Sequence, residues 1–106
     1  MVVSKINMIA GLFRAFAFET ISVTTVKSLT ASSYQDTDGN AARRAIITVE
    51  AARISYRWDG GTPTSSVGHT ANPNDVILVV GGTNIRNFKA IKKDSATPTL
   101  RITFER

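Results

Sequence analysis

Hydrophobic and polar residues alternate along several short segments of this chain, as they do in strands that have one face in a core. The C-terminal segment shows this most clearly, because Leu100, Ile102 and Phe104 alternate with polar residues. Residues 20–29 and 45–50 are rich in β-branched side chains and also predict strands. The run at 76–80 is apolar throughout, which predicts a strand buried on both faces.

Residues 53–58 combine the same alternation with aromatic side chains. Ile54, Tyr56 and Trp58 are expected to face the core, and the intervening residues to form a basic outer surface. The spacing leaves open whether 45–50 and 53–58 form one bent strand or two. Asp59-Gly60-Gly61 then predicts a turn into a polar loop.

The remaining segments are connections. Residues 31–42 are rich in Ser, Asp, Gly and Asn, have almost nothing to bury and predict an exposed loop, whereas 83–87 predict a single helical turn. Roughly six to eight short strands, with no long helix, indicate an all-β protein: a small antiparallel β-sandwich or jelly roll, or a small barrel. We expect residues 1–19 to form an N-terminal arm or first strand and 20–106 to form the β-sandwich domain.

Length, cysteine content and charge limit the number of domains, the kinds of stabilising site and the kinds of partner. A chain of 106 residues fits one domain with its own core, and without cysteine it has neither a disulfide nor a zinc–thiolate site. The formal charge of +5 suits acidic partners, but the cations are spread along the chain, which is typical of a generic basic surface.

The N-terminal apolar run at 8–13 is interrupted soon afterwards by Arg14 and Glu19. It is too short for a signal peptide core or a membrane helix, so we expect neither. The alternative is an arm whose apolar side chains pack on the domain or on a neighbouring subunit. Its candidate contact residues are Met8, Ile9, Leu12, Phe13, Phe16 and Phe18.

Candidate catalytic and metal-binding motifs are incomplete. Residues 36–40 begin like a calcium loop, but Ala41 and Ile47 stand where that loop needs glycine and glutamate. His69 has Ser65, Ser66 and Asp75 nearby in sequence, without a nucleophile elbow around either serine. We therefore expect no enzyme activity, no metal and no cofactor.

Six cations could gather on one sheet face if three predicted strands lie together: Arg53, Arg57, Lys89, Lys92, Lys93 and Arg101. Such a patch would bind an acidic protein surface or a nucleic-acid backbone. The alternative, which the charge spacing favours, is a solvated strand face that discourages edge aggregation.

Four segments together resemble small virion proteins of tailed bacteriophages: ISYRWDGGTPTSSVGH (54–69), NPNDVILVVGG (72–82), IRNFKAIKK (85–93) and ATPTLRITF (96–104). Within that group the resemblance is closest to jelly-roll cement or decoration proteins of the capsid, and neck or tail components are similar in size. It implies a non-enzymatic protein of the virion, assembled in the host cytoplasm. Its partners would be the major capsid protein or other virion proteins, and copies of itself in a dimer or trimer.

The surfaces expected to bind these partners are the apolar arm, Tyr34 in its polar loop, and four of the cations, Arg53, Arg57, Lys89 and Lys92. A second class of function is a basic module that binds glycan or nucleic acid. The positive charge and the positions of Tyr34 and His69 in polar loops motivate it.

Overall fold

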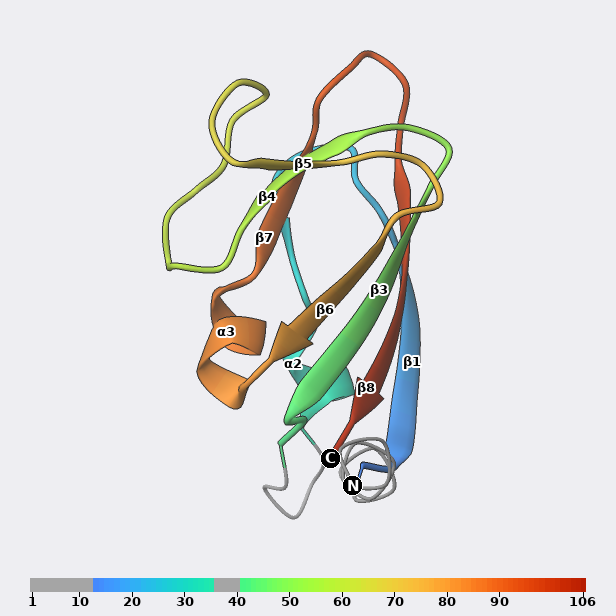
Figure 1. Cartoon of the computed structure of the whole chain (residues 1–106), viewed down its shortest axis with the longest axis vertical. Coiled ribbons are helices and arrows are strands. Elements are labelled where there is room, and N and C mark those ends of the chain that lie inside the picture. Colours follow the sequence, from blue (N-terminus) through green and yellow to red (C-terminus); the bar gives the residue numbers. More distant parts are fainter. Residues whose placement is uncertain (1–12, 36–40) are drawn as a thin grey trace, which may run out of the picture.

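The computed structural model describes residues 13–35 and 41–106, and these form two four-stranded antiparallel sheets packed as a sandwich (Figure 1). The expected all-β fold is confirmed. The long sheet has the order β1 (Ala15–Ser22), β8 (Thr99–Glu105), β3 (Arg44–Glu50) and β6 (Val76–Val80). The short sheet has the order β2 (Lys27–Ser28), β7 (Lys89–Lys92), β4 (Ile54–Arg57) and β5 (His69–Ala71).

The strand pairing is nested: β1 pairs with β8, β2 with β7, β3 with β6, and β4 with β5. This is the pattern of one long hairpin that has been rolled up, which defines a jelly roll. Rolling adds the β3–β8 and β4–β7 pairs that complete the two sheets. Because every pair joins strands far apart in sequence except β4–β5, the fold brings distant segments onto common faces.

The core lies between the sheets. Alternation in β8 and β3 works as predicted, since Leu100, Ile102 and Phe104 are fully buried opposite Ile47 and the other inward residues of β3. The short sheet contributes the buried side chains of Ile54 on β4 and Ala90 on β7. Two further large buried residues, Val23 and Phe88, lie in connections between strands. The predicted helical turn is present as α3 (Gly82–Asn87). No helix within residues 13–35 and 41–106 has the length and apolar character to cross a membrane.

One strand prediction needs correction, and two alternatives left open by the sequence are resolved. The segment 20–29 is not one strand, because β1 ends at Ser22 and β2 contains only Lys27–Ser28. Of the arm or first strand expected at 1–19, the described residues from Ala15 onward form the first strand, β1, which continues to Ser22. Of the two options for 45–58, the structure has two strands: β3 ends at Glu50, Ala51 adopts a φ of +75°, and β4 begins in the other sheet.

The prediction that 31–42 buries almost nothing is wrong. Residues Ala31–Tyr34 form the short helix α2, and the ring of Tyr34 lies 6.0 Å from that of Phe104 in the core. Ala42 is also buried. One aromatic ring, that of Tyr34, holds the described part of this segment against the core.

Candidate functional site

The largest departure from the sequence-based expectation is β6, which is not buried on both faces. Ile77 and Val79 are buried, whereas Val76, Leu78 and Val80 are 62%, 54% and 53% exposed. The reason is architectural: in a two-layer sandwich each strand has a core on one side only. The outward half of this apolar strand is therefore left on the surface.

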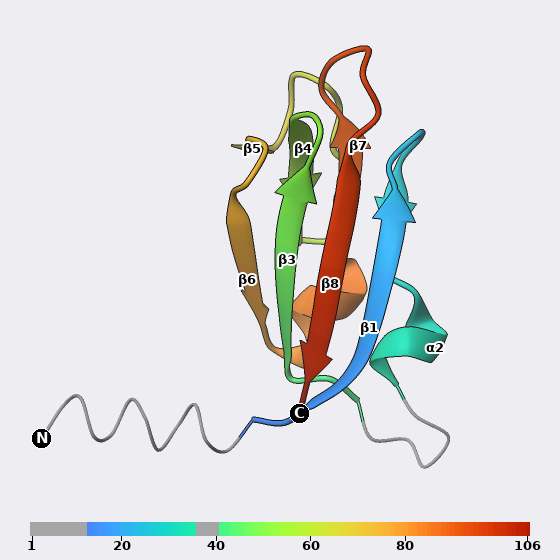
Figure 2. The ribbon, with the colours of Figure 1, turned by 90° about the vertical axis from the view of Figure 1, so that its right-hand side faces the viewer.

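The exposed β6 residues continue into a row across the whole long sheet. Leu78 lies opposite Ile46, Ile46 opposite Thr103, and Thr103 opposite Phe18. Side chains directly opposite in a sheet share a face, so these four residues line up from one edge strand to the other. Phe18 is 61% exposed. Figure 2 looks onto this sheet and shows β6, β3, β8 and β1 side by side.

We call the set Phe18, Ile46, Val76, Leu78 and Val80 the apolar face. A hollow of 360 Å³ adjoins it at Phe18 and is lined by Phe16, Ala17 and Thr103, among others. The four residues on β6 and β3 are neighbours, whereas Thr103 separates Phe18 from them. Clustered exposed apolar side chains mark an interaction site more often than scattered single residues do. Only Phe18 of this set was expected from the sequence. The available signal was the unbroken apolar run at 76–80, which a two-layer domain cannot bury on both sides.

The other N-terminal phenylalanines contact their own domain. The guanidinium carbon of Arg44 lies 4.2 Å from the centre of the Phe13 ring, and that of Arg106 lies 4.4 Å from the Phe16 ring. Both rings are half-buried. Cation–π contacts of this kind hold the rings in place. The remaining arm candidates, Met8, Ile9 and Leu12, lie outside the described residues.

The six predicted cations do not form a single patch. Arg101 is in the long sheet, whereas Arg57, Lys89 and Lys92 are in the short sheet. Arg57 lies opposite Lys89, but Lys92 lies opposite the buried Ile54. Lys92 is therefore on the inward face of the short sheet, opposite to the face of Arg57 and Lys89. These positions favour the solvated-face alternative over a common binding surface.

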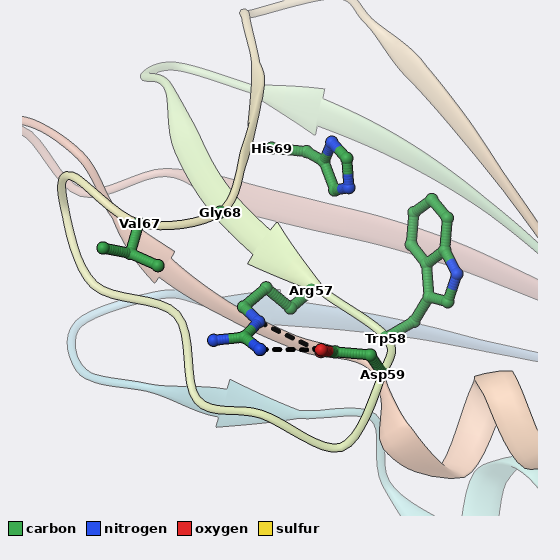
Figure 3. Close-up of a pocket in the computed structure, with 6 residues that line it drawn as sticks. All are labelled: Arg57, Trp58, Asp59, Val67, Gly68 and His69. Carbon is green, nitrogen blue, oxygen red and sulfur yellow. Dashed lines mark hydrogen bonds and ion pairs between the residues drawn. The ribbon is translucent and has the colours of Figure 1, made fainter.

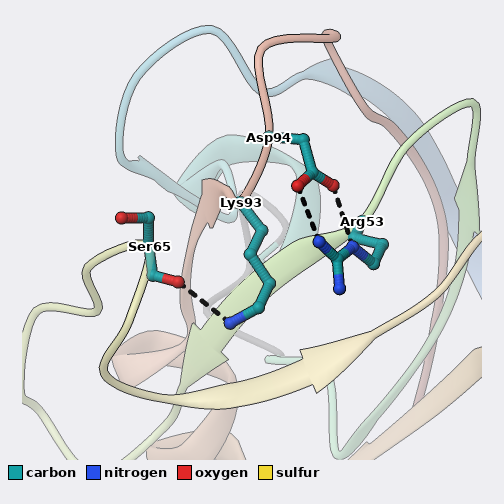
Figure 4. Close-up of polar contacts among 4 residues, drawn as sticks. All are labelled: Arg53, Ser65, Lys93 and Asp94. Atoms are coloured by element: carbon teal, nitrogen blue, oxygen red, sulfur yellow. Dashed lines mark hydrogen bonds and ion pairs between the residues drawn. The ribbon is translucent and has the colours of Figure 1, made fainter.

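Carboxylates also neutralise three of these cations, Arg53, Arg57 and Arg101. Arg53 donates to both oxygens of Asp94 at 2.8 and 2.7 Å, and Arg101 pairs with Glu50. Lys93 donates from Nζ to the carbonyl of Ser65 at 2.9 Å, as Figure 4 shows beside the Arg53–Asp94 pair. The hydrogen bonds from Arg53 lower the pKa of Asp94, so this pair stays ionised at neutral pH.

A second site is a pocket of 340 Å³ at the end of β4, lined by Arg57, Trp58, Asp59, Val67, Gly68 and His69 (Figure 3). The rings of Trp58 and His69 are stacked, 5.4 Å apart with an angle of 15° between their planes. The centre of the Tyr56 ring lies 5.6 Å from that of Trp58 and 5.5 Å from that of His69. Trp58 was expected to be a core residue, and it is half-buried against the core at the pocket.

An ion pair forms the polar side of this pocket. Arg57 donates to the two carboxylate oxygens of Asp59 at 3.0 and 2.6 Å, and the amide of Gly61 also donates to Asp59. The Arg57 hydrogen bond, followed by that from Gly61, lowers the pKa of Asp59 to about 2. Burial, and then the charge of Asp75, raise the pKa of Tyr56, so its hydroxyl is neutral.

The loop that closes this pocket also covers the outer face of β4. Ser55 was predicted to lie on a basic outer surface, but its side chain is fully buried and donates to the carbonyl of Val67 at 3.1 Å. Gly68 passes so close that a Cβ there would lie 2.6 Å from Ser55 Oγ. The loop is therefore a fixed part of the domain on this side.

The structure does not bring His69 together with Ser65, Ser66 and Asp75 as a hydrolytic triad. His69 stacks on Trp58, Asp75 accepts a hydrogen bond from the amide of Asn72, and Ser66 contacts Thr64. Within the described ranges, no hydrogen bond joins His69 to any of the three partners. No group of three or more His, Asp or Glu side chains suited to a metal occurs in the described part of the chain either. The calcium-like segment 36–40 lies outside it.

No family model, curated protein or solved structure matches this chain.

Proposed function

We propose that this protein is a structural component of a tailed-phage virion, a cement or decoration protein that binds the major capsid shell through the apolar face. The observation that carries the proposal is the group of exposed apolar side chains on the outer face of the long sheet: Val76, Leu78 and Val80 on β6, with Ile46 opposite Leu78 on β3 and Phe18 on β1. An assembly partner would remove this surface from water.

The energetics suit a repeated contact. Phe18, Val76, Leu78 and Val80 are each more than half exposed, so covering them would contribute about 1 kcal/mol per side chain. Rigid-body association alone costs at least about 4 kcal/mol, so a single copy would bind weakly through these residues. Many copies on one lattice overcome that limit through multivalency, which is how a cement protein works.

The resemblance to small phage virion proteins supports the same function. Its segment 72–82 contains β6, which supplies Val76, Leu78 and Val80 of the apolar face. Its segments 54–69 and 96–104 contain β4 with its covering loop, and most of β8. The resembling residues thus build the framework that presents the proposed binding surface. A neck or tail component would use the same surface against a different virion protein.

Co-sedimentation with empty shells tests the proposal. Wild-type protein should pellet with shells in a saturable ratio to the major capsid protein. Phe18→Ser should weaken binding by about fivefold or more, because it removes the aromatic ring of the apolar face. Val67→Ser is the matched control, since Val67 is also an exposed hydrophobic residue but lies in the loop beside the aromatic pocket.

Circular dichroism confirms that each variant is folded before binding is compared. If wild-type protein stays in the supernatant with shells but binds isolated neck or tail complexes, the protein is a neck or tail component and not a capsid cement protein. Equal binding of Phe18→Ser and wild type would exclude the apolar face as the contact.

The aromatic pocket supports a second candidate, a glycan- or nucleic-acid-binding module. Stacked Trp58 and His69 beside the Arg57–Asp59 pair could take a sugar or a base. Trp58 is the only tryptophan, so its fluorescence reports directly on this pocket. Titration with oligosaccharides and with an oligonucleotide, at low and high salt, should change the emission if this function holds. Unchanged emission for every ligand would exclude it.

A further inference from the structure

We infer that β6 is a self-association edge: it pairs antiparallel with β6 of a second copy, about a two-fold axis at Leu78, and joins the two long sheets into one of eight strands. The inference concerns the backbone edge of the sheet rather than its outer face, and it does not depend on the proposed virion role. It is carried by the edge's lack of protection, its free hydrogen-bonding groups and its self-complementary sequence.

The described strands present four sheet edges, and three of them are poor templates for pairing. β2 has two residues and β5 has three. β1 is longer, but its register shifts between Ala15 and Ala17, and Glu19 lies opposite the fully buried Ile102. Short strands, irregular register and inward-facing charges are the devices by which proteins prevent edge pairing.

β6 has none of these devices. Its five residues, Val76–Val80, are all apolar, and they pair with β3 in uninterrupted register. In Figure 2, β6 forms the margin of the long sheet, no described strand pairs with its outer edge, and α3 reaches that edge at Val80 through Asn84. An apolar edge in regular register, without charge or proline, is the kind that pairs with another strand.

Alternate residues of β6 have backbone N–H and C=O groups that do not bond to β3 and so point to the open edge. The backbone amide of Val49 donates to the backbone carbonyl of Asp75 at 3.0 Å, and that of Gly81 donates to the backbone carbonyl of Arg43 at 2.7 Å. In an antiparallel ladder, bonded residues alternate. Ile77 and Val79 therefore bond to β3, and the N–H and C=O groups of Val76, Leu78 and Val80 point to the open edge. The side chain of Asn84 donates to the Val80 carbonyl at 2.9 Å, which leaves the rest of this set for a partner strand.

The strand is complementary to itself when inverted. An axis at Leu78 places Leu78 opposite the partner's Leu78, Val76 opposite the partner's Val80, and Ile77 opposite the partner's Val79. Every facing pair is apolar, and Asp75 would meet the partner's Gly81, so no like charges are brought together. Apolar side chains that face each other across the pair cover each other's surface from water, which favours this register.

A strand of five residues is about 17 Å long, so the contact is small. Interfaces below about 1,200 Å² are typical of weak or transient complexes. We therefore expect a reversible dimer that forms with rising protein concentration. On a shell, pairing would place the β6 side chains of two copies side by side and create one continuous apolar surface.

Sedimentation velocity and native mass spectrometry over a concentration series test the inference in solution. Wild type should shift from monomer to dimer. Leu78→Lys should raise the dissociation constant at least tenfold, because it places two like charges together at the axis. Val67→Lys, the same chemical change at a loop position of similar exposure, should dimerise like wild type. Phe18→Ser should also dimerise normally, which separates this inference from shell binding.

A charge-swap experiment locates the axis. Leu78→Lys and Leu78→Glu should each be monomeric, and their equimolar mixture should recover the dimer, since residue 78 meets residue 78 only in this geometry. Amide exchange at Leu78 should slow as wild-type protein concentration rises. A wild type that stays monomeric at millimolar concentration, a dimer that tolerates Leu78→Lys, or a mixture that fails to recover would each overturn the inference.

Discussion

Replacing Gly68 by alanine tests how closely the loop after β4 is held against the sheet. Gly68 adopts a φ of +137°, and a Cβ there would lie 2.6 Å from Ser55 Oγ and 3.0 Å from the carbonyl oxygen of Tyr56. The backbone strain is worth on the order of 1–3 kcal/mol, and overpacking adds about 1–3 kcal/mol. We expect Gly68→Ala to lower the free energy of unfolding by about 2–5 kcal/mol, a large part of the total for a domain of this size.

Gly60→Ala is the matched control, because Gly60 also has a positive φ, +92°, but a Cβ there would have no atom within 4 Å. It should cost only the strain, about 1–2 kcal/mol. Urea denaturation of both variants gives the comparison. In the double variant Gly68→Ala/Ser55→Ala the loss should be smaller than the sum of the two single losses by about 1 kcal/mol, because the clashing hydroxyl is gone. Equal destabilisation by Gly60→Ala and Gly68→Ala would refute the close approach of the loop to Ser55.

Two further predictions concern the core and the ion pair at the pocket. Phe104→Ala removes a fully buried ring and should cost about 3–5 kcal/mol by chemical denaturation, whereas Thr103→Ala on the outer face should cost about 0.5 kcal/mol or less; similar losses would contradict the assigned facing of β8. Because Arg57 and the Gly61 amide lower the pKa of Asp59 in the folded state to about 2, below its usual 3.8, its stabilising effect is complete above about pH 4 and is lost as the pH falls through 2. Thermal melts should show a weaker loss of stability over this range for Asp59→Asn than for wild type, and parallel profiles would count against the pair.

The fold could be predicted from sequence because its signals are local. Alternation at Leu100, Ile102 and Phe104 shows which side chains enter the core, and β-branched runs and turn residues define most strands. What alternation cannot give is the partner of each strand. The nested pairing depends on contacts between distant segments, such as β1 with β8, and no local pattern encodes them.

The candidate site was harder to predict for the same reason. An unbroken apolar strand such as β6 has the same sequence whether its outer face meets a second layer or solvent, and only the two-layer architecture decides. The pairing of Arg53 with Asp94 joins residues 41 positions apart, so the sequence showed the cations without their partners. The short-range Arg57–Asp59 pair, by contrast, could have been proposed from residues two positions apart at the end of a strand.

Cryo-electron microscopy of the assembled particle tests the central claim most directly. The account predicts ordered density for this protein on the capsid, with the outer face of the β1-β8-β3-β6 sheet against the shell and Phe18 and Leu78 in contact with the major capsid protein. A particle in which this sheet faces solvent, or that lacks the protein altogether, would contradict the account.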